Sequence, residues 1–161
     1  MGRDAAAISD VIDNLRRVFQ VINDSSRNAE QATGLTGPQI WVLKILAGDA
    51  PMRVSELARR MYLRPATVVG ILDRLEGKGM VTRTRSQLDR RAVDLNLTDE
   101  GRALVATAPG IAQDMLVKGL DELTDEQFAS VEEGMKQMAH LLGAEHLVPQ
   151  PLHTESRWAK G

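Results

Sequence analysis

The feature that most constrains the fold is a change of hydrophobic period in the middle of the chain. Apolar residues recur at three- and four-residue spacing in two short segments, residues 54–61 and 65–75, as they do along one face of a helix. The pattern then changes to the alternation that is typical of strands, in residues 80–86 and 92–97. The order of elements is therefore helix, tight turn, helix and two-stranded hairpin, which is the order of a winged helix-turn-helix.

A long helix is expected before this unit. Gly34 and Gly37 interrupt its helical pattern, and Thr36 with Gln39 has the spacing of a capping box. A second helix is expected to begin there and to stop near Gly48. The apolar stripe of the first helix consists of Ile8, Val11, Ile12, Leu15, Val18, Phe19 and Ile22.

Two further helices are expected after the hairpin. Thr98 is placed to cap one that extends to about residue 120, with a bend near Pro109 and Gly110. Thr124 with Gln127 forms another capping box and begins a last helix that carries its own apolar stripe. The sequence therefore predicts a mainly helical fold with a small β-hairpin wing.

The charge of the chain is unevenly distributed. The formal net charge is −2, which argues against nucleic-acid binding when it is taken alone. The stretch from Arg53 to Arg91, however, holds ten basic and four acidic residues (net +6), whereas the rest holds ten basic and eighteen acidic residues (net −8). A basic centre between acidic arms is typical of a DNA-binding module, although a solvated charged face has the same composition.

The basic residues stand where this arrangement of elements would meet DNA. The second short helix begins with the small residues Pro65–Thr67, which allow a close approach to bases in the major groove. Arg64 and Arg74 lie before and along that helix, within reach of base edges or phosphates. Arg90 and Arg91 lie at the expected tip of the hairpin, which can enter the adjacent minor groove.

The central region resembles the core of the MarR family of winged helix-turn-helix regulators. The run that carries the resemblance is RVSELARRMYLRPATVVGILDRLEGKGMVTRTRSQLDRRAVDLNLTDEGRAL. Its matching pieces are SELA, then DRLEGKGMV at the end of the recognition helix, DRRA in the wing and LTDEG at the start of the next helix. The similarity is tight over about 55 residues and looser over the flanking helices. It implies a DNA-binding transcriptional regulator of repressor type.

The resemblance also implies a homodimer on a palindromic operator in double-stranded DNA. It divides the chain into an N-terminal dimerisation helix (1–34), a winged helix-turn-helix domain (35–98), C-terminal dimerisation helices (99–143) and an extended or disordered tail (144–161). Arg91 is implied as the minor-groove residue, and Asp89 as the residue that orients the wing by pairing with a nearby arginine. The candidate DNA-binding residues are Arg53, Arg64, Pro65, Ala66, Thr67, Gly70, Arg74, Arg83, Asp89, Arg90 and Arg91.

Two of these residues depart from the family pattern. Arg53 stands where a helix-capping Thr or Ser is usual, so a cap is expected to be missing and a phosphate contact to be gained. Gly70 stands inside the recognition helix where a larger polar residue is common, and it weakens that helix by up to about 1 kcal/mol relative to Ala. Arg83 is expected to hold a phosphate.

A small aromatic or anionic ligand that relieves operator binding is the expected signal. Trp41, with Arg16 and Arg17 as counter-charges, is the candidate ligand-binding set, although core packing is the favoured reading for Trp41 itself. The alternative is a dimeric protein that binds DNA or another regulator without any small-molecule ligand. Titration with small aromatic acids separates the two hypotheses.

Other classes of function find little support in the sequence. Cysteine is absent, and the three histidines are too scattered for a metal site, so no metal and no cofactor are expected. No set of nucleophile, base and acid can be assembled, so we do not expect an enzyme. No membrane span and no signal peptide are recognisable, and a cytoplasmic location is expected.

Overall fold

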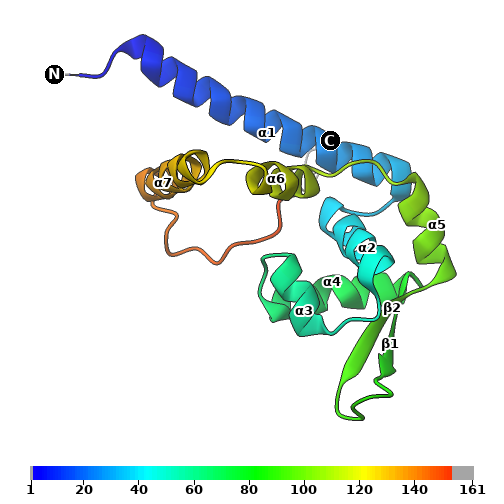
Figure 1. Ribbon diagram of the computed structural model, residues 1–161. Coiled ribbons are helices and arrows are strands. Elements are labelled where there is room, and N and C mark those ends of the chain that lie inside the picture. The colour runs from blue at the N-terminus through cyan, green and yellow to red at the C-terminus, as the bar shows by residue number, and fades with distance from the viewer. Residues whose placement is uncertain (1, 154–161) are drawn as a thin grey trace.

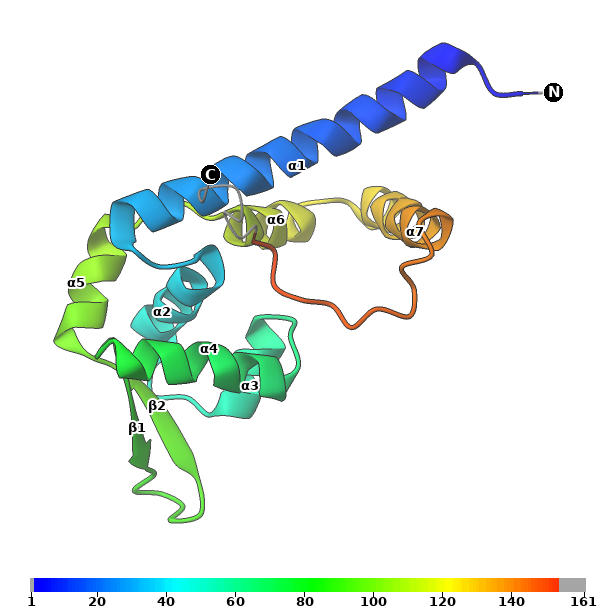
Figure 2. The ribbon, with the colours of Figure 1, turned by 180° about the vertical axis from the view of Figure 1, so that it is seen from behind.

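The computed structural model describes residues 2–153, so residues 154–161 of the expected tail lie outside the described part of the chain. Figure 1 shows a lobe of short helices with a projecting hairpin, beneath a layer formed by one long helix, α1, with α6 and α7. Figure 2 shows from behind that the hairpin points away from this layer. The expected mainly helical fold with a β-hairpin wing is confirmed. Within the described residues, no helix is long and apolar enough to cross a membrane.

Helix α1 (Ala5–Thr33) begins three residues before its apolar stripe and continues to the predicted stop. Asp4 caps its first turn by accepting the N–H of Ala6 at 3.2 Å. Gly34 ends it in the left-handed conformation (φ 70°) and donates its N–H to the carbonyl of Glu30. The buried residues of α1 lie only near its C-terminal end, and most of its apolar stripe is exposed within one chain.

Helix α2 (Gly37–Asp49) forms the centre of the lobe. Both hydrogen bonds of the predicted capping box are present, since Thr36 and Gln39 each accept the other's backbone N–H. Most of its residues are buried, and apolar side chains point in all directions from it. A helix that is apolar all round belongs in the core, and the other elements of the lobe pack around α2.

The two short helices are present as the sequence predicts. Helix α3 (Val54–Arg60) has no side-chain cap at Arg53, as expected from the missing Thr or Ser. A tight turn in which Tyr62 has a positive φ of 55° leads to α4 (Pro65–Gly77). Pro65 occupies the first turn of α4, where its missing N–H costs nothing.

The wing is an antiparallel pair of strands, β1 (Val81–Arg85) and β2 (Val93–Leu97). Its base is anchored because Leu95 also pairs with Met52, exchanging two backbone hydrogen bonds of 2.8 and 3.3 Å. Val81, Leu95 and Leu97 are buried at the base, whereas Val93 and most residues of the tip are exposed. The base of the hairpin is therefore fixed to the lobe, and its tip is free to contact another molecule.

The region after the wing differs in one respect from the expected single bent helix. Helix α5 (Asp99–Thr107) ends before Pro109, and α6 (Ala112–Asp121) begins after Gly110, so the expected bend is a complete break. The predicted caps at Thr98 and Thr124 are confirmed, and the second of them begins α7 (Asp125–Leu141). Pro109 lacks an N–H and disfavours helical backbone in the residue before it, which explains the break.

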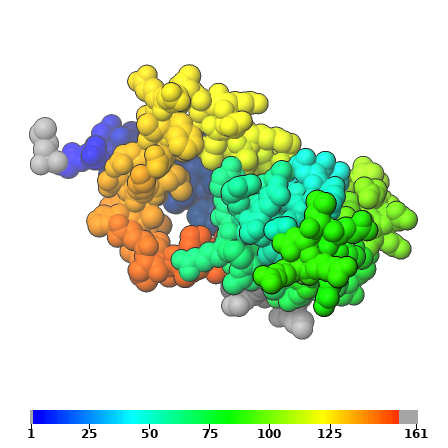
Figure 3. Space-filling view, turned by 60° about the horizontal axis from the view of Figure 1, so that its bottom comes forward, coloured from blue at the N-terminus to red at the C-terminus, as the bar shows by residue number. Residues whose placement is uncertain are grey.

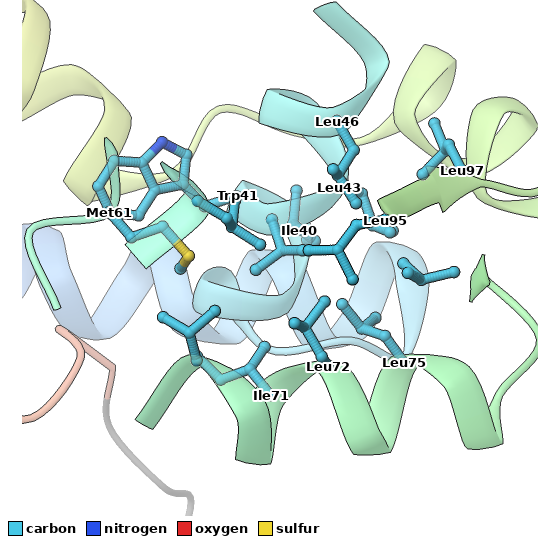
Figure 4. Close-up of a cluster of buried hydrophobic side chains, with 14 of the residues drawn as sticks. Ile40, Trp41, Leu43, Leu46, Met61, Ile71, Leu72, Leu75, Leu95 and Leu97 are labelled. Carbon is cyan, nitrogen blue, oxygen red and sulfur yellow. The ribbon is translucent and has the colours of Figure 1, made fainter. Parts of the chain in front are cut away.

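One hydrophobic core holds the lobe together (Figure 4). Ile40, Leu43 and Leu46 of α2 lie between Leu72 and Leu75 of α4 and the strand residues of the wing base. All of these side chains are almost completely buried. Because α4 and the wing both pack on α2, the recognition helix and the hairpin are held as one rigid unit.

Candidate DNA-binding interface

The outward face of α4 is suited to close contact with a flat or grooved surface. Val68, Ile71, Leu72 and Leu75 anchor the helix in the core, and the opposite face of the helix is exposed. Ala66, Gly70 and Arg74 recur every four residues and are all exposed, so they form one face. A Cβ added at Gly70 would touch no atom within 4 Å, so the glycine leaves open space on this face.

The N-terminus of α4 lies at the same exposed end. Arg64 is the N-cap residue and makes no capping hydrogen bond, so its side chain extends from the start of the helix. Pro65 and Ala66 are exposed, and Thr67 is half-buried. Pro65 has no N–H and Thr67 donates its N–H to the carbonyl of Arg64 at 3.1 Å, so Ala66 supplies the backbone donor of this turn. That donor, the positive end of the helix dipole and the adjacent guanidinium favour phosphate oxygens or base acceptors.

The tip of the wing is held in a defined shape by two side chains. Asp89 accepts the N–H of Arg91 on Oδ1 at 3.0 Å, and its carbonyl accepts the N–H of Ala92 at 2.9 Å. Ser86 is buried and accepts the N–H of Leu88 on Oγ at 3.3 Å. Arg90 and Arg91 are exposed on this ordered turn, which presents two positive charges at the end of the hairpin.

Arg53 and Asp89 connect the wing to the start of α3. Asp89 Oδ2 lies 3.8 Å from Arg53 Nη2, and both side chains are about half exposed, at 49% and 53%. Arg53 is therefore the arginine that best matches the partner expected for Asp89. An exposed pair of this length contributes at most about 1 kcal/mol, so Arg53 is readily available to an anion.

Arg83 lies in a different environment from the one that the sequence suggested. Its guanidinium lies 2.7 Å from the carboxylate of Asp73 and 2.9 Å from that of Glu76, both on α4. These two carboxylates compensate the charge of Arg83 and connect the first strand of the wing to the recognition helix. Since a phosphate would have to compete with two carboxylates, positioning of the wing is the role that the geometry favours for Arg83.

Arg60 is likewise engaged by carboxylates. It forms ion pairs with Asp49 and Glu56, and the hydrogen bond with Asp49 raises the pKa of Arg60 above its usual value. Arg85, in contrast, is exposed at the outer end of β1 and was missed by the sequence analysis. Arg85 alternates with Arg83 along one strand, and this pattern in the sequence could have identified Arg85 as a further positive charge on the wing.

The predicted ligand-binding residues are not brought together. Trp41 is only 4% exposed and packs in the core, where Figure 4 shows it beside Met61. Arg16 projects from α1 with 71% of its side chain exposed and pairs with Asp13. Arg17 alone lines a groove, and that groove lies between α1 and α6. Of the two readings that the sequence left open for Trp41, core packing is therefore the one that the structure favours.

The fold and this surface define a winged helix-turn-helix DNA-binding protein, and comparison with known proteins agrees. The model of the MarR family matches residues 35–93. The HTH-type transcriptional repressor MdtR of Bacillus subtilis (strain 168) is 34% identical over 134 residues, which cover 83% of this chain and 82% of MdtR. The chain belongs to the MarR family and is a DNA-binding transcriptional regulator.

Two solved structures support the same assignment. A MepR-like protein complexed with pseudoligands is 27% identical, with a TM-score of 0.55 over 86% of this chain and 95% of that one. The YusO protein from Bacillus subtilis is 31% identical, with a TM-score of 0.53 over 86% of this chain and 99% of YusO. Both alignments extend beyond the DNA-binding lobe into the flanking helices.

Proposed function

We propose that the chain acts as a homodimer that places two winged lobes on one palindromic operator and represses transcription from it. Residues 1–34 and 99–143 serve as the dimerisation helices, and residues 35–98 as the DNA-binding domain. The chain acts through binding rather than catalysis. The observation that carries the proposal is the large apolar surface that the outer helices leave uncovered.

Helix α7 is the clearest case. None of its 17 residues is buried, although Phe128, Val131 and Met135 form an apolar stripe along it. A helix of this length is only marginally stable in water when nothing packs on its apolar face. On α1, Val11 and Phe19 are more than half exposed. A second copy related by two-fold symmetry covers such faces on both chains at once.

Two lobes held by such a dimer would meet DNA in successive grooves. We assign base reading in the major groove to Arg64, Ala66, Thr67 and Arg74, and phosphate contact to Arg53. Arg91 is assigned to the minor groove, where width and A·T content are read. Half-sites should then lie about one helical turn apart, roughly 10 base pairs.

A charge placed in the apolar stripe of α1 tests the dimer. Phe19→Glu is expected to convert the dimer to monomer at micromolar concentration and to weaken DNA binding at least about tenfold, because the two lobes then bind separately. Gln20→Glu is the matched control, since it adds the same charge at an exposed position outside the stripe. Sedimentation velocity and fluorescence anisotropy measure the two effects. A Phe19→Glu chain that stays dimeric would overturn the assignment of α1.

We propose further that a small aromatic or anionic ligand relieves operator binding. The support is the groove of about 470 Å³ between α1 and α6, which is lined almost entirely by apolar side chains such as Val18, Ile22 and Met115. Among the described residues that line it, Arg17 is the single charged one, which suits an apolar body with one negative group. A ligand there would bias the spacing of the lobes only through unequal affinity for two arrangements of the dimer.

Arg17→Ala tests this ligand response. Small aromatic acids are expected to raise the dissociation constant of wild type for its operator, and to do so with at least about fivefold lower potency on Arg17→Ala. Arg16→Ala is the control, because Arg16 lies on the same helix outside the groove. Unchanged operator affinity across a broad panel of such acids would favour the alternative, a dimeric regulator without a small-molecule ligand.

A further inference from the structure

We propose that Val69 of the recognition helix contacts the 5-methyl group of a thymine in the major groove, and thereby selects thymine at one position of each half-site. The contact depends on the proposed placement of α4 in the major groove, to which it adds a base that is read. Among the described residues of α4, Val69 is the one large hydrophobic residue that is exposed, at 40%. It takes no part in the core that holds the lobe together.

The direction in which Val69 faces follows from the ion pairs of the wing. Val69, Asp73 and Glu76 are spaced by four and three residues, so they lie in one row along α4. Arg83 of β1 lies 2.7 Å from the carboxylate of Asp73 and 2.9 Å from that of Glu76, so this row faces the wing. Val69 lies one turn nearer to the N-terminus of α4, beyond the two residues that Arg83 engages. It therefore faces the space between the recognition helix and the wing.

That space is open to another molecule. Figures 1 and 2 show α4 and the wing on the side of the lobe away from α1. Figure 3 shows the outer helices, in yellow and orange, beside the lobe rather than over the face that it turns to the viewer. Ala66 and Gly70 lie next to Val69 on the helix surface, and a Cβ added at Gly70 would meet no atom within 4 Å. A base edge can therefore approach the methyl groups of Val69 without meeting a longer side chain at either position.

The chemistry of the major groove identifies the group that Val69 meets. The base edges present hydrogen-bond donors and acceptors there, and the 5-methyl group of thymine is their apolar group. A donor or acceptor pressed against valine would lose its hydrogen bond to water and gain none, which is unfavourable. Asp73, the next residue of the row, is compensated by Arg83, so it places no unpaired negative charge beside the contact. Thymine is therefore the base that Val69 favours.

Replacement of thymine by 2′-deoxyuridine tests the contact, because it removes the 5-methyl group and leaves the hydrogen-bonding groups of the base unchanged. Each thymine of an operator selected from a random library is replaced together with its two-fold-related partner, and fluorescence anisotropy gives the dissociation constant. One such double replacement is expected to weaken binding of wild type about three- to fifteenfold, since one buried methyl group is lost in each half-site. Val69→Ala is expected to bind the thymine operator more weakly than wild type and to bind both duplexes equally at that position.

Two further variants separate the methyl contact from other effects. Val69→Ile keeps an apolar side chain and should still distinguish thymine from deoxyuridine. Val148→Ala makes the same truncation at a valine outside the lobe that is exposed to a similar extent, at 48%, and should behave as wild type does. Val69→Ala itself should fold as wild type does, because alanine is the more favourable residue in the interior of a helix.

Two results would overturn the contact while operator recognition remained in place. One is equal sensitivity of wild type and Val69→Ala to deoxyuridine at every thymine, and the other is no sensitivity of wild type at any thymine. If wild type bound the selected operator no more tightly than a scrambled duplex, the proposed base reading by α4 would fail as well, and the contact of Val69 with it.

Discussion

Arg91→Ala is expected to weaken binding to the operator by about 2–6 kcal/mol, since a symmetric dimer loses one minor-groove contact of roughly 1–3 kcal/mol in each half-site. Arg91 lies on the exposed wing tip, and its backbone is fixed by the hydrogen bond to Asp89. In the described residues no ion pair engages its guanidinium, in contrast to Arg83, so its charge is available to the groove. Fluorescence anisotropy on a duplex selected from a random library measures the loss.

Two further results distinguish a wing contact from a general loss of charge. Arg27→Ala removes one positive charge from α1, where Arg27 pairs with Asp24, and should bind DNA nearly as wild type does. The Arg91→Ala chain should still rank duplexes with altered major-groove bases as wild type does, because α4 is unchanged. An Arg91→Ala chain with wild-type affinity would show that the wing does not read the minor groove.

Among substitutions of the described glycines by alanine, Gly101→Ala is expected to lower the free energy of unfolding the most. A Cβ at this position would lie 2.4 Å from the carbonyl oxygen of Met80 and 2.9 Å from Cδ1 of Leu97. The Met80 carbonyl accepts the N–H of Thr98 at 3.1 Å, so it cannot move without loosening the junction of α4, wing and α5. We expect the free energy of unfolding to fall by at least about 3 kcal/mol.

The control for this substitution is Gly70→Ala. A Cβ at Gly70 meets no atom within 4 Å, and alanine favours the interior of a helix. The free energy of unfolding should therefore rise by up to about 1 kcal/mol. Urea unfolding followed by circular dichroism, at one protein concentration for all chains, measures both changes. A Gly101→Ala chain as stable as wild type would contradict the close approach of α5 to the Met80 carbonyl.

The boundaries of the helices were largely predictable because local chemistry sets them. Thr36, Thr98 and Thr124 each cap the helix that the sequence assigns to them. The exposure of Arg74 between buried Leu72 and Leu75 follows directly from helical periodicity. The missing cap at Arg53 was predictable as well, because the presence of a capping hydrogen bond depends on the side chain of that one residue.

The features that the sequence did not reveal depend on contacts between distant residues. Helix α2 is apolar on every side, so periodicity does not show whether Trp41 faces the core or a cavity; its packing beside Met61 decides. The engagement of Arg83 depends on two carboxylates of α4 that the hairpin brings into reach. The need for glycine at position 101 depends on the carbonyl of Met80, which lies between α4 and β1.

Sedimentation velocity of wild type, alone and with the selected operator, measures the number of chains in the free protein and on each duplex. We expect a particle with twice the mass of one chain in the absence of DNA. With operator in excess we expect two chains per duplex, bound in one step to a sequence with two-fold symmetry. A monomer that binds an asymmetric site with one chain per duplex would contradict the proposed dimer.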